Sequence, residues 1–242
     1  MTITQRSNPR TRLTIMLALA ACGAFLALAA IIVVLQNDRN DPVTTPAPNA
    51  ATARAYPTQP STSEARSAPP TAAPAGISWS LVGQAAVPVS ASDGPARISG
   101  CIASGFVRSP VGALIAAAQI STRAGYYAGR SCWEPTITDQ VTASADRDAL
   151  LSLLRDADSQ GQPDADPGDL APIVAFRYLS YTSDTAVVGL IRRSPQGNLA
   201  QTTLTLTWVD ADWKLAAPPG GRWPALITPL TDLAGAVTWG AS

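Results

Sequence analysis

Apolar positions along this chain follow three successive patterns. Residues 13–35 form an unbroken run of 23 residues that contains no charged side chain. Residues 36–76 are polar and hold eight of the prolines. Residues 77–242 carry apolar side chains at the spacings of helices and strands, which is typical of a packed domain. We therefore predict a basic tail over residues 1–12, then a transmembrane helix, a tether and one folded domain.

The apolar run is long enough to cross a bilayer as one helix. At about 1.5 Å per residue, a helix over residues 13–35 spans roughly 35 Å, and the hydrocarbon core of a bilayer is about 30 Å thick. Arg6, Arg10 and Arg12 precede the run, and no acidic residue lies among the first twelve positions. Because positive residues favour the cytoplasmic side, we expect a single-pass protein of the cell membrane with a cytoplasmic N-terminus and an extracytoplasmic C-terminal domain.

The segment from Leu19 to Cys22 leaves a second interpretation of the N-terminus open. Its sequence, Leu-Ala-Ala-Cys, is similar to a bacterial lipobox, in which the chain is cut before a cysteine that then carries lipid. The apolar stretch of a signal peptide usually ends at its cleavage site after about 7–15 residues, whereas this one continues to Leu35. We therefore favour the uncleaved span and keep lipidation at Cys22 as the alternative.

Residues 36–76 have the composition of a spacer. Proline lacks the backbone N–H that helices and sheets use, and this segment has almost no large apolar side chain that could join a core. A proline-rich chain of this length extends up to about 100 Å. We predict a disordered tether that holds the folded domain away from the membrane, with an O-glycosylated stalk as the alternative.

The folded domain is predicted to begin with extended chain and a first helix. Residues 77–100 form an extended lead-in that is interrupted by a Gly-Pro turn. Ser109 and Pro110 are favoured at the N-cap and the first position of a helix. Apolar and mostly small residues then recur at helical spacing until Gly125, so this helix is suited to packing on a sheet.

A second helical region is predicted from about residue 136 to residue 157. Thr136 and Asp139 have the spacing of a capping pair in its first turn. Ser144 provides a second N-cap, at which the helix restarts.

From residue 173 the apolar period changes to two, which predicts strands. The candidates are residues 173–182, 185–193 and 199–209, with a hairpin turn at residues 194–198. An Asp-Ala-Asp turn then leads into a short fourth strand candidate at residues 213–215.

The order of these elements predicts an α+β fold. Near the C-terminus, Thr228 and Pro229 are expected to open a short helix. Two or three helices on a strongly bent antiparallel sheet of about four strands form the cone of the nuclear-transport-factor-two-like fold. The alternative is a helix-on-meander domain without the closed cavity of the cone.

Two of the three cysteines lie in the folded domain. In an oxidising compartment, Cys101 and Cys132 are candidates for a disulfide. A bridge that closes this loop would stabilise the domain by roughly 3–4 kcal/mol in the chain-entropy treatment. Two buried free thiols are the alternative.

The charge of the folded domain argues against direct nucleic-acid binding. Residues 77–242 hold eleven lysines and arginines against fourteen acidic residues, and no stripe of arginines is present. A protein that neutralises a phosphate backbone needs the opposite balance.

Few catalytic arrangements are available to this sequence. It contains no histidine, which removes the usual general base and the usual metal ligand. It also has no glycine-rich phosphate loop and no nucleophile elbow. We therefore predict no catalytic residue, no cofactor and no metal.

Three weaker candidates have simpler structural interpretations. The acidic segment 156–169 suggests calcium, but a calcium loop begun at Asp156 would need an acid where Pro167 stands, so a solvated connector is the better interpretation. Asp139 with Tyr126 and Tyr127 would suit a cone-fold enzyme, yet paired tyrosines after a helix more often lie at the edge of a core. Trp208 and Trp213 are similarly expected to pack in a hairpin rather than to bind a ligand.

A set of turn and packing residues resembles a known group of proteins. The set is Trp79, Val87-Pro88-Val89-Ser90, Gly94-Pro95, Gly105-Phe106, Ser109-Pro110-Val111-Gly112-Ala113-Leu114, Trp208-Val209-Asp210-Ala211-Asp212-Trp213 and Trp239-Gly240. From about residue 79 to 240, the chain resembles single-pass membrane proteins of actinobacterial conjugative plasmids and integrative elements. Those proteins look like relatives of the bitopic inner-membrane component of type IV secretion channels, whose outer domain has the cone fold. The resemblance implies a fold and a family but transfers no functional residue.

These observations lead to one predicted function and two alternatives. We expect an assembly or scaffold subunit of a conjugative DNA-transfer apparatus, which contacts other membrane or channel proteins or further copies of itself. The first alternative is an extracytoplasmic binding module for a small molecule or a cell-wall component. The second is an isomerase or dehydratase, which would be favoured by a deep cavity holding an ionisable residue of perturbed pKa.

Overall fold

The computed structural model describes residues 68–161 and 171–241. The predicted transmembrane helix at residues 13–35, Cys22 and most of the predicted tether lie outside these ranges. Within them, no helix has both the length and the apolar character needed to cross a membrane. The predicted anchor therefore stays a prediction.

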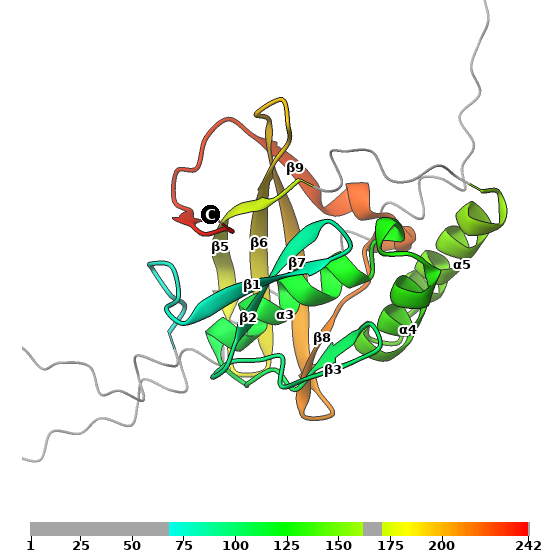
Figure 1. Cartoon of the computed structure of the whole chain (residues 1–242), viewed down its shortest axis with the longest axis horizontal. Helices are drawn as coiled ribbons and strands as arrows, with labels where there is room; N and C mark the ends of the chain where they lie inside the picture. Colours follow the sequence, from blue (N-terminus) through cyan, green and yellow to red (C-terminus); the bar gives the residue numbers. More distant parts are fainter. Residues whose placement is uncertain (1–67, 162–170, 242) are drawn as a thin grey trace, which may run out of the picture. The chain divides into compact units, whose positions relative to one another are not determined.

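Along the described chain, four short strands are followed by three helices and then by six more strands (Figure 1). The helices are α3 (Pro110–Arg123), α4 (Arg130–Gln140) and α5 (Ala145–Ser159), with short 3₁₀ turns η1 (Tyr126–Ala128), η3 (Pro219–Gly221) and η4 (Trp223–Leu226). The strands are β1 (Ile77–Val82), β2 (Ala85–Ser90), β3 (Arg97–Ser99), β4 (Ile102–Ser104), β5 (Ile173–Tyr181), β6 (Thr185–Arg193), β7 (Leu199–Val209), β8 (Asp212–Leu215), β9 (Ile227–Leu230) and β10 (Val237–Thr238).

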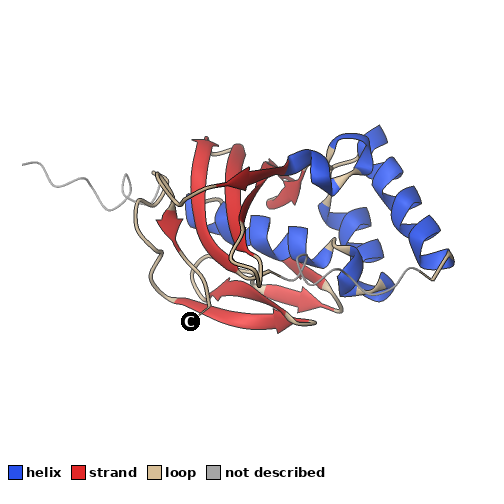
Figure 2. Cartoon of the chain, turned by 90° about the horizontal axis from the view of Figure 1, so that it is seen from above, coloured by secondary structure: helices blue, strands red, loops and turns tan. Residues whose placement is uncertain are grey.

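The main sheet is antiparallel and has six strands. Its order is β10-β5-β6-β7, and both β8 and β9 pair with the free edge of β7. Figure 2 shows that the long strands bend along their length, that one helix lies against them and that the other helices lie beyond one end of the sheet. The helix against the strands is α3. The predicted α+β class, with helices on a curved antiparallel sheet, is confirmed. The sheet is wider than the predicted four strands because two C-terminal strands join its edges.

Helix α3 lies between the main sheet and the β1–β2 hairpin (Figures 1 and 2). Its N-cap is Ser109, whose hydroxyl accepts a hydrogen bond from the N–H of Gly112 at 2.9 Å. The residues from Ala113 to Ala118 are fully buried, and most are alanines, so strands approach closely on both sides of the helix. Gln119 donates to the carbonyl of Pro88 in β2 at 2.8 Å. The first predicted helix is confirmed.

The second helical region starts earlier than predicted. Helix α4 begins at Arg130, so Thr136 is an interior residue, fully buried, whose hydroxyl donates to the carbonyl of Cys101 at 3.4 Å. The predicted capping pair of Thr136 and Asp139 is therefore wrong. Thr136 and Asp139 have the spacing of a cap, but the chain before them is already helical and carries Pro135 inside the helix. Burial of the preceding turn against the core outweighs the missing N–H.

Helix α5 begins where the sequence predicted a restart. The hydroxyl of Ser144 accepts a hydrogen bond from the N–H of Arg147 at 3.1 Å. Leu150 and Leu151 are buried on the inner side of the helix. The N-cap signal at Ser144 is therefore confirmed.

The strands after residue 173 match the predicted ranges, whereas the C-terminal tail does not. Strands β5, β6 and β7 coincide with the three candidates within one residue. The predicted helix at Thr228 and Pro229 is wrong, because this segment forms β9. Pro229 pairs with Ala200 of β7, and β9 has no partner on its other side in the described sheet. An edge strand tolerates a residue that lacks the N–H.

All six tryptophans belong to the folded part of the chain and pack on its core. Trp133 and Trp213 are fully buried. Trp79 of the hairpin packs on Trp239 near the C-terminus, with ring centroids 5.0 Å apart. Trp208 lies opposite Trp213 across β7 and β8, with centroids 5.4 Å apart, which confirms the predicted hairpin packing.

Candidate ligand-binding cavity

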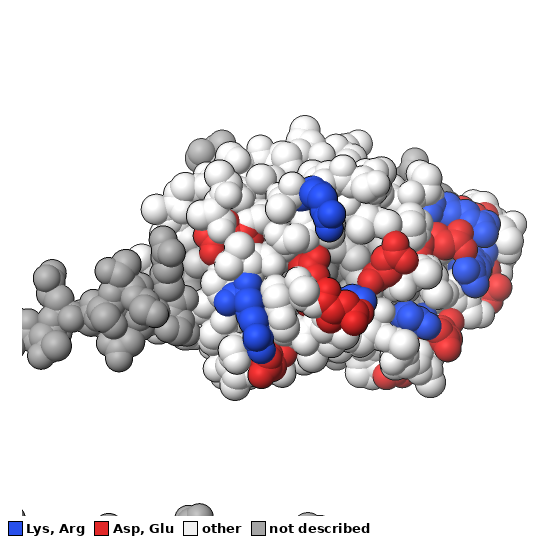
Figure 3. Space-filling model, turned by 90° about the horizontal axis from the view of Figure 1, so that it is seen from below, with Lys and Arg blue, Asp and Glu red and all other residues white. Residues whose placement is uncertain are grey.

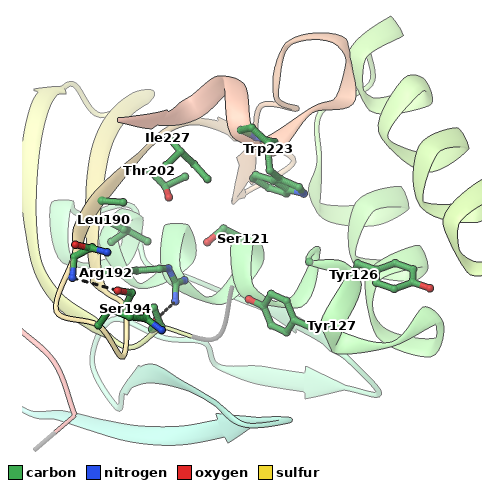
Figure 4. A pocket seen from close by; sticks show the side chains of 15 residues that line it. Ser121, Tyr126, Tyr127, Leu190, Arg192, Ser194, Thr202, Trp223 and Ile227 are labelled. Atoms are coloured by element: carbon green, nitrogen blue, oxygen red, sulfur yellow. Dashed lines mark hydrogen bonds between the residues drawn. The ribbon is translucent and has the colours of Figure 1, made fainter. Parts of the chain in front are cut away.

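A cavity of about 480 Å³ lies between the C-terminal end of α3, the β6–β7 hairpin and η4 (Figure 4). Its walls combine aromatic and aliphatic side chains with a few polar groups. Among them are Ser121, Tyr126, Tyr127, Leu190, Arg192, Thr202, Trp223 and Ile227. The exposed residues Gln196 and Asn198 also line it, so the cavity reaches the protein surface.

The strand alternation of β6 places Arg192 in this cavity. Ala186, Val188 and Leu190 occupy one face of β6 and are fully buried in the core. Arg192 continues the same row by one step, because side chains alternate along a strand. Opposite it on β7 stands Ala200, a small residue. The core-facing row of β6 therefore ends in a charged residue, and the small side chain of Ala200 opposite it leaves space.

The turn after α3 places the two tyrosines. Gly125 separates the end of α3 from η1, and a Cβ at this position would lie 2.6 Å from Cε1 of Tyr127. Glycine therefore allows the Tyr127 ring to lie against the end of the helix. In Figure 4 the Tyr127 hydroxyl points toward the Arg192 side of the cavity, whereas the ring of Tyr126 points away from it.

Two hydrogen bonds hold the Arg192 guanidinium in place. Nη1 donates to the carbonyl of Ala171 at 3.0 Å, and Nη2 donates to the hydroxyl of Thr122 at 3.2 Å. In residues 68–161 and 171–241, no carboxylate forms an ion pair with Arg192. Burial lowers the pKa of Arg192, and the nearby Tyr127 opposes this by raising it. Because a guanidinium stays protonated in proteins, the cavity holds a positive charge that the described carboxylates leave unpaired.

Asp139 does not join the tyrosines that sequence reasoning placed beside it. Tyr126 and Tyr127 line the cavity, whereas Asp139 lines a separate hollow beside α4. The arrangement of a carboxylate with two tyrosines, which would have suited a cone-fold enzyme, is therefore not assembled in the structure.

Charged residues of α4 and α5 pair with one another at the protein surface. Glu134 forms ion pairs with Arg130 at 2.7 Å and with Arg155 at 2.6 Å. The hydrogen bond from Arg130, followed by that from Arg155, lowers the pKa of Glu134. Figure 3 shows acidic and basic side chains interspersed on one face of the molecule, with a mixed cluster at the end where α4 and α5 lie. These charges form a solvated helix surface.

The two cysteines of the folded part are joined in a disulfide. Their Cα atoms are 4.8 Å apart, and the bond links the residue before β4 to helix α4. Elsewhere in the described ranges, no three His, Cys, Asp or Glu residues lie close enough together to hold a metal ion. Of the acidic segment, Asp156 and Asp158 belong to α5, and residues 162–170 lie outside the described chain.

Sequence reasoning named neither Arg192 nor Trp223 as part of a site. One signal was present for Arg192, since a charged residue interrupts the otherwise apolar core row of β6. No local pattern singles out Trp223. Its contribution to the cavity depends on how the C-terminal segment returns to the edge of β7.

The fold and the cavity define the class of this protein: an α+β domain that carries a pocket of ligand size at one end of its main sheet. Residues 37–238 match the family model of a domain of unknown function, DUF8175, and this match covers more than half of the chain. The chain therefore belongs to the DUF8175 family. No curated protein and no solved structure matches the chain. The family match begins inside the proline-rich segment, so it extends beyond the folded part.

Proposed function

We propose that the folded domain is an extracytoplasmic binding module that takes a small molecule or a cell-wall component into the cavity. The observation that carries this proposal is the cavity itself. Its volume of about 480 Å³ falls within the range of ligand pockets, roughly 300–1,000 Å³. The predicted tether and anchor would present the module at the membrane.

The walls of the cavity support binding in a defined orientation. Leu190, Trp223 and Ile227 offer apolar surface, and burial of apolar ligand surface is worth about 25 cal/mol per Å². The hydroxyls of Ser121 and Thr202 add a small number of polar groups. Ligand pockets commonly combine these two features, with apolar contacts for affinity and polar contacts for orientation.

The described lining supports recognition better than acid–base catalysis. Its titratable groups are Arg192 and the two tyrosines of η1. An arginine holds its proton throughout the physiological range, so the lowered pKa of Arg192 does not make it a general base. We therefore propose a protein that binds its ligand without making or breaking a bond.

The test is a binding screen on the full chain in lipid nanodiscs. Ligand-observed NMR against soluble cell-wall fragments and a metabolite library should reveal ligands whose binding is lost in Trp223→Ala. The matched control is Trp208→Ala, because Trp208 is also a half-buried tryptophan at the edge of the core but does not line the cavity. If no compound binds in a Trp223-dependent way, the proposal is wrong.

A second function is supported by apolar side chains on the surface. Leu81 of β1 is 72% exposed and Ile98 of β3 is 54% exposed, and apolar groups left at a surface favour contacts with other proteins. Together with the resemblance to conjugative-element proteins, they support an assembly subunit of a DNA-transfer apparatus whose domain is a nuclear-transport-factor-two-like cone. Its partners would be other membrane or channel proteins or a second copy of this chain.

The two functions predict opposite results in a mating assay. A strain that lacks the protein should transfer DNA less often if the chain is an assembly subunit. Complementation with Leu81→Ser and Ile98→Ser should then fail, whereas complementation with Trp223→Ala should succeed. Transfer at the wild-type rate in the deletion strain would exclude the assembly role and leave the binding module unaffected.

A further inference from the structure

The cavity contains a positive charge that its described surroundings do not neutralise. Of the five N–H groups of Arg192, two are used by the carbonyl of Ala171 and the hydroxyl of Thr122. Both of these acceptors are neutral. Arginines that are shielded from water are normally ion-paired or fully hydrogen-bonded in proteins, because an unpaired buried charge is costly. A bound anion would supply the charged partner that Arg192 lacks among residues 68–161 and 171–241.

The guanidinium is also held in one orientation before any ligand arrives. Its two acceptors come from different parts of the chain: Thr122 lies in α3 and is fully buried, and Ala171 precedes β5 and is buried as well. A group that is fixed in advance loses little conformational entropy when it binds. Arg192 therefore resembles a built receptor for a hydrogen-bond acceptor more than a solvated side chain.

The surroundings of Arg192 favour a singly charged, planar anion. In the described lining no second lysine or arginine accompanies it, whereas a phosphate dianion is usually held by several cationic or N–H donors. A guanidinium fork matches the two oxygens of a carboxylate. The Trp223 ring and the side chains of Leu190 and Ile227 provide apolar wall for the rest of such a ligand.

On this basis, and resting on the proposed binding function, we infer that the cavity selects ligands carrying a carboxylate, which Arg192 receives while an apolar or aromatic body lies against Trp223. The carboxylate can belong to a free organic acid or to the C-terminus of a peptide. In both cases the recognised chemistry is the same.

The test compares acids with their neutral amides. The full chain in nanodiscs is titrated with phenylacetate and phenylacetamide, with N-acetyl-D-alanyl-D-alanine and its C-terminal amide, and with inorganic phosphate, at one ionic strength. We expect at least one acid to bind about tenfold to a hundredfold more tightly than its amide, as hydrogen bonds to a charged group imply. Preference for phenylacetate or for the peptide acid then identifies the source of the carboxylate.

Neighbouring arginines provide a matched pair of variants. Arg192→Gln should abolish the preference for the acid over the amide, and Arg192→Lys should retain part of it, because the charge stays but the fork is lost. Arg193→Gln is the control, since Arg193 is the adjacent residue of β6 but is exposed and absent from the lining. Should Arg192→Gln fail to fold, the acid–amide comparison on the unmodified chain still decides.

Each contrary result has a distinct meaning. Equal binding of acids and amides, with both weakened by Trp223→Ala, would overturn carboxylate selection and leave the binding function intact. Tighter binding of inorganic phosphate than of any acid would overturn it as well. If neither the acids, the amides nor the library compounds bind, the proposed function fails together with this inference.

Discussion

Two arginines of this protein, Arg123 and Arg192, are shielded from solvent to different degrees and have different surroundings. Arg123, in the last turn of α3, is 5% exposed and lies in a closed region beneath the disulfide. Its Nε donates to Gln119 at 3.0 Å, and its Nη1 donates to the carbonyl of Cys101 at 3.2 Å. Arg192 is half-buried, ends the core-facing row of β6 and lines a cavity that reaches the surface.

Burial has the same electrostatic effect on both arginines. It lowers the pKa of Arg123 and of Arg192, and in the described part of the chain neither forms an ion pair with a carboxylate. What differs is the space beside them. Arg123 donates hydrogen bonds to protein oxygens between packed elements, which gives it a structural role. Arg192 lies beside empty volume in the cavity. Free volume next to a buried charge, rather than the charge alone, therefore marks the functional candidate.

We expect the largest effect on stability from removing the disulfide beside Arg123. The double variant Cys101→Ser with Cys132→Ser should lower the free energy of unfolding by about 3–4 kcal/mol, because the unfolded chain regains the entropy of the loop that the disulfide closes. Urea unfolding followed by tryptophan fluorescence measures this. Ligand binding at the Arg192 cavity should be unchanged. A loss of binding in the folded double variant would show that the two regions are coupled.

Replacing each arginine by methionine tests directly whether the two side chains contribute differently to stability. Arg123→Met should cost about 2 kcal/mol, because Gln119 and the carbonyl of Cys101 lose their donor inside a closed region. Arg192→Met should cost less than about 0.5 kcal/mol, since the cavity admits water to the groups it leaves behind. Paired urea titrations of the two variants provide the measurement. Equal costs at the two positions would contradict the comparison.

A smaller effect is expected at the entrance to η1. Gly125→Ala brings a Cβ to within 2.6 Å of the Tyr127 ring unless that ring moves. We expect a loss of about 1 kcal/mol in stability, the usual cost of a mild steric clash in a packed region. Ligand affinity should also change, because the ring forms part of the cavity. Urea unfolding measures the stability, and an unchanged free energy of unfolding would show that the Tyr127 ring moves at no cost.

The smallest effect should be a pH dependence that belongs to neither arginine region. Ion pairs with Arg130 and Arg155 lower the pKa of Glu134 in the folded state. A depressed pKa means that the contribution to stability is present above the pKa of the unfolded chain and is lost as the pH falls through the folded value. Glu134→Gln should therefore reduce the decline in stability between about pH 5 and pH 3. An unchanged pH profile of the unfolding free energy would show that these exposed pairs contribute nothing.

Much of the fold could be predicted because its signals are local. Ser109 and Pro110 specify the start of α3 through the geometry of the cap, and the alternation of apolar residues specifies β6 and β7. The turn at Asp210 and Ala211 is likewise local, with both residues at positive φ between two paired strands. Each of these elements depends on residues only a few positions apart, so a sequence pattern suffices.

The errors arose where tertiary contacts overrode local preference. Thr136 and Asp139 have the spacing of a capping pair, yet the buried turn before them extends α4 back to Arg130. Pro229 argues against a strand, yet an edge position beside β7 accepts it. In both cases the deciding interaction comes from residues distant in the sequence, which a local pattern does not contain.

By itself, the sequence determined the class of fold, the ranges of the central strands, the cap of α3 and the absence of histidine chemistry, because composition and short-range periodicity carry that information. It also predicted which two cysteines would pair. Only the tertiary structure decided that Arg192, Tyr127 and Trp223 share one cavity. Those residues belong to a strand, a turn and a C-terminal segment whose proximity depends on strand pairing and on the position of α3. Packing of elements far apart along the chain creates that space, and no local spacing of residues encodes it.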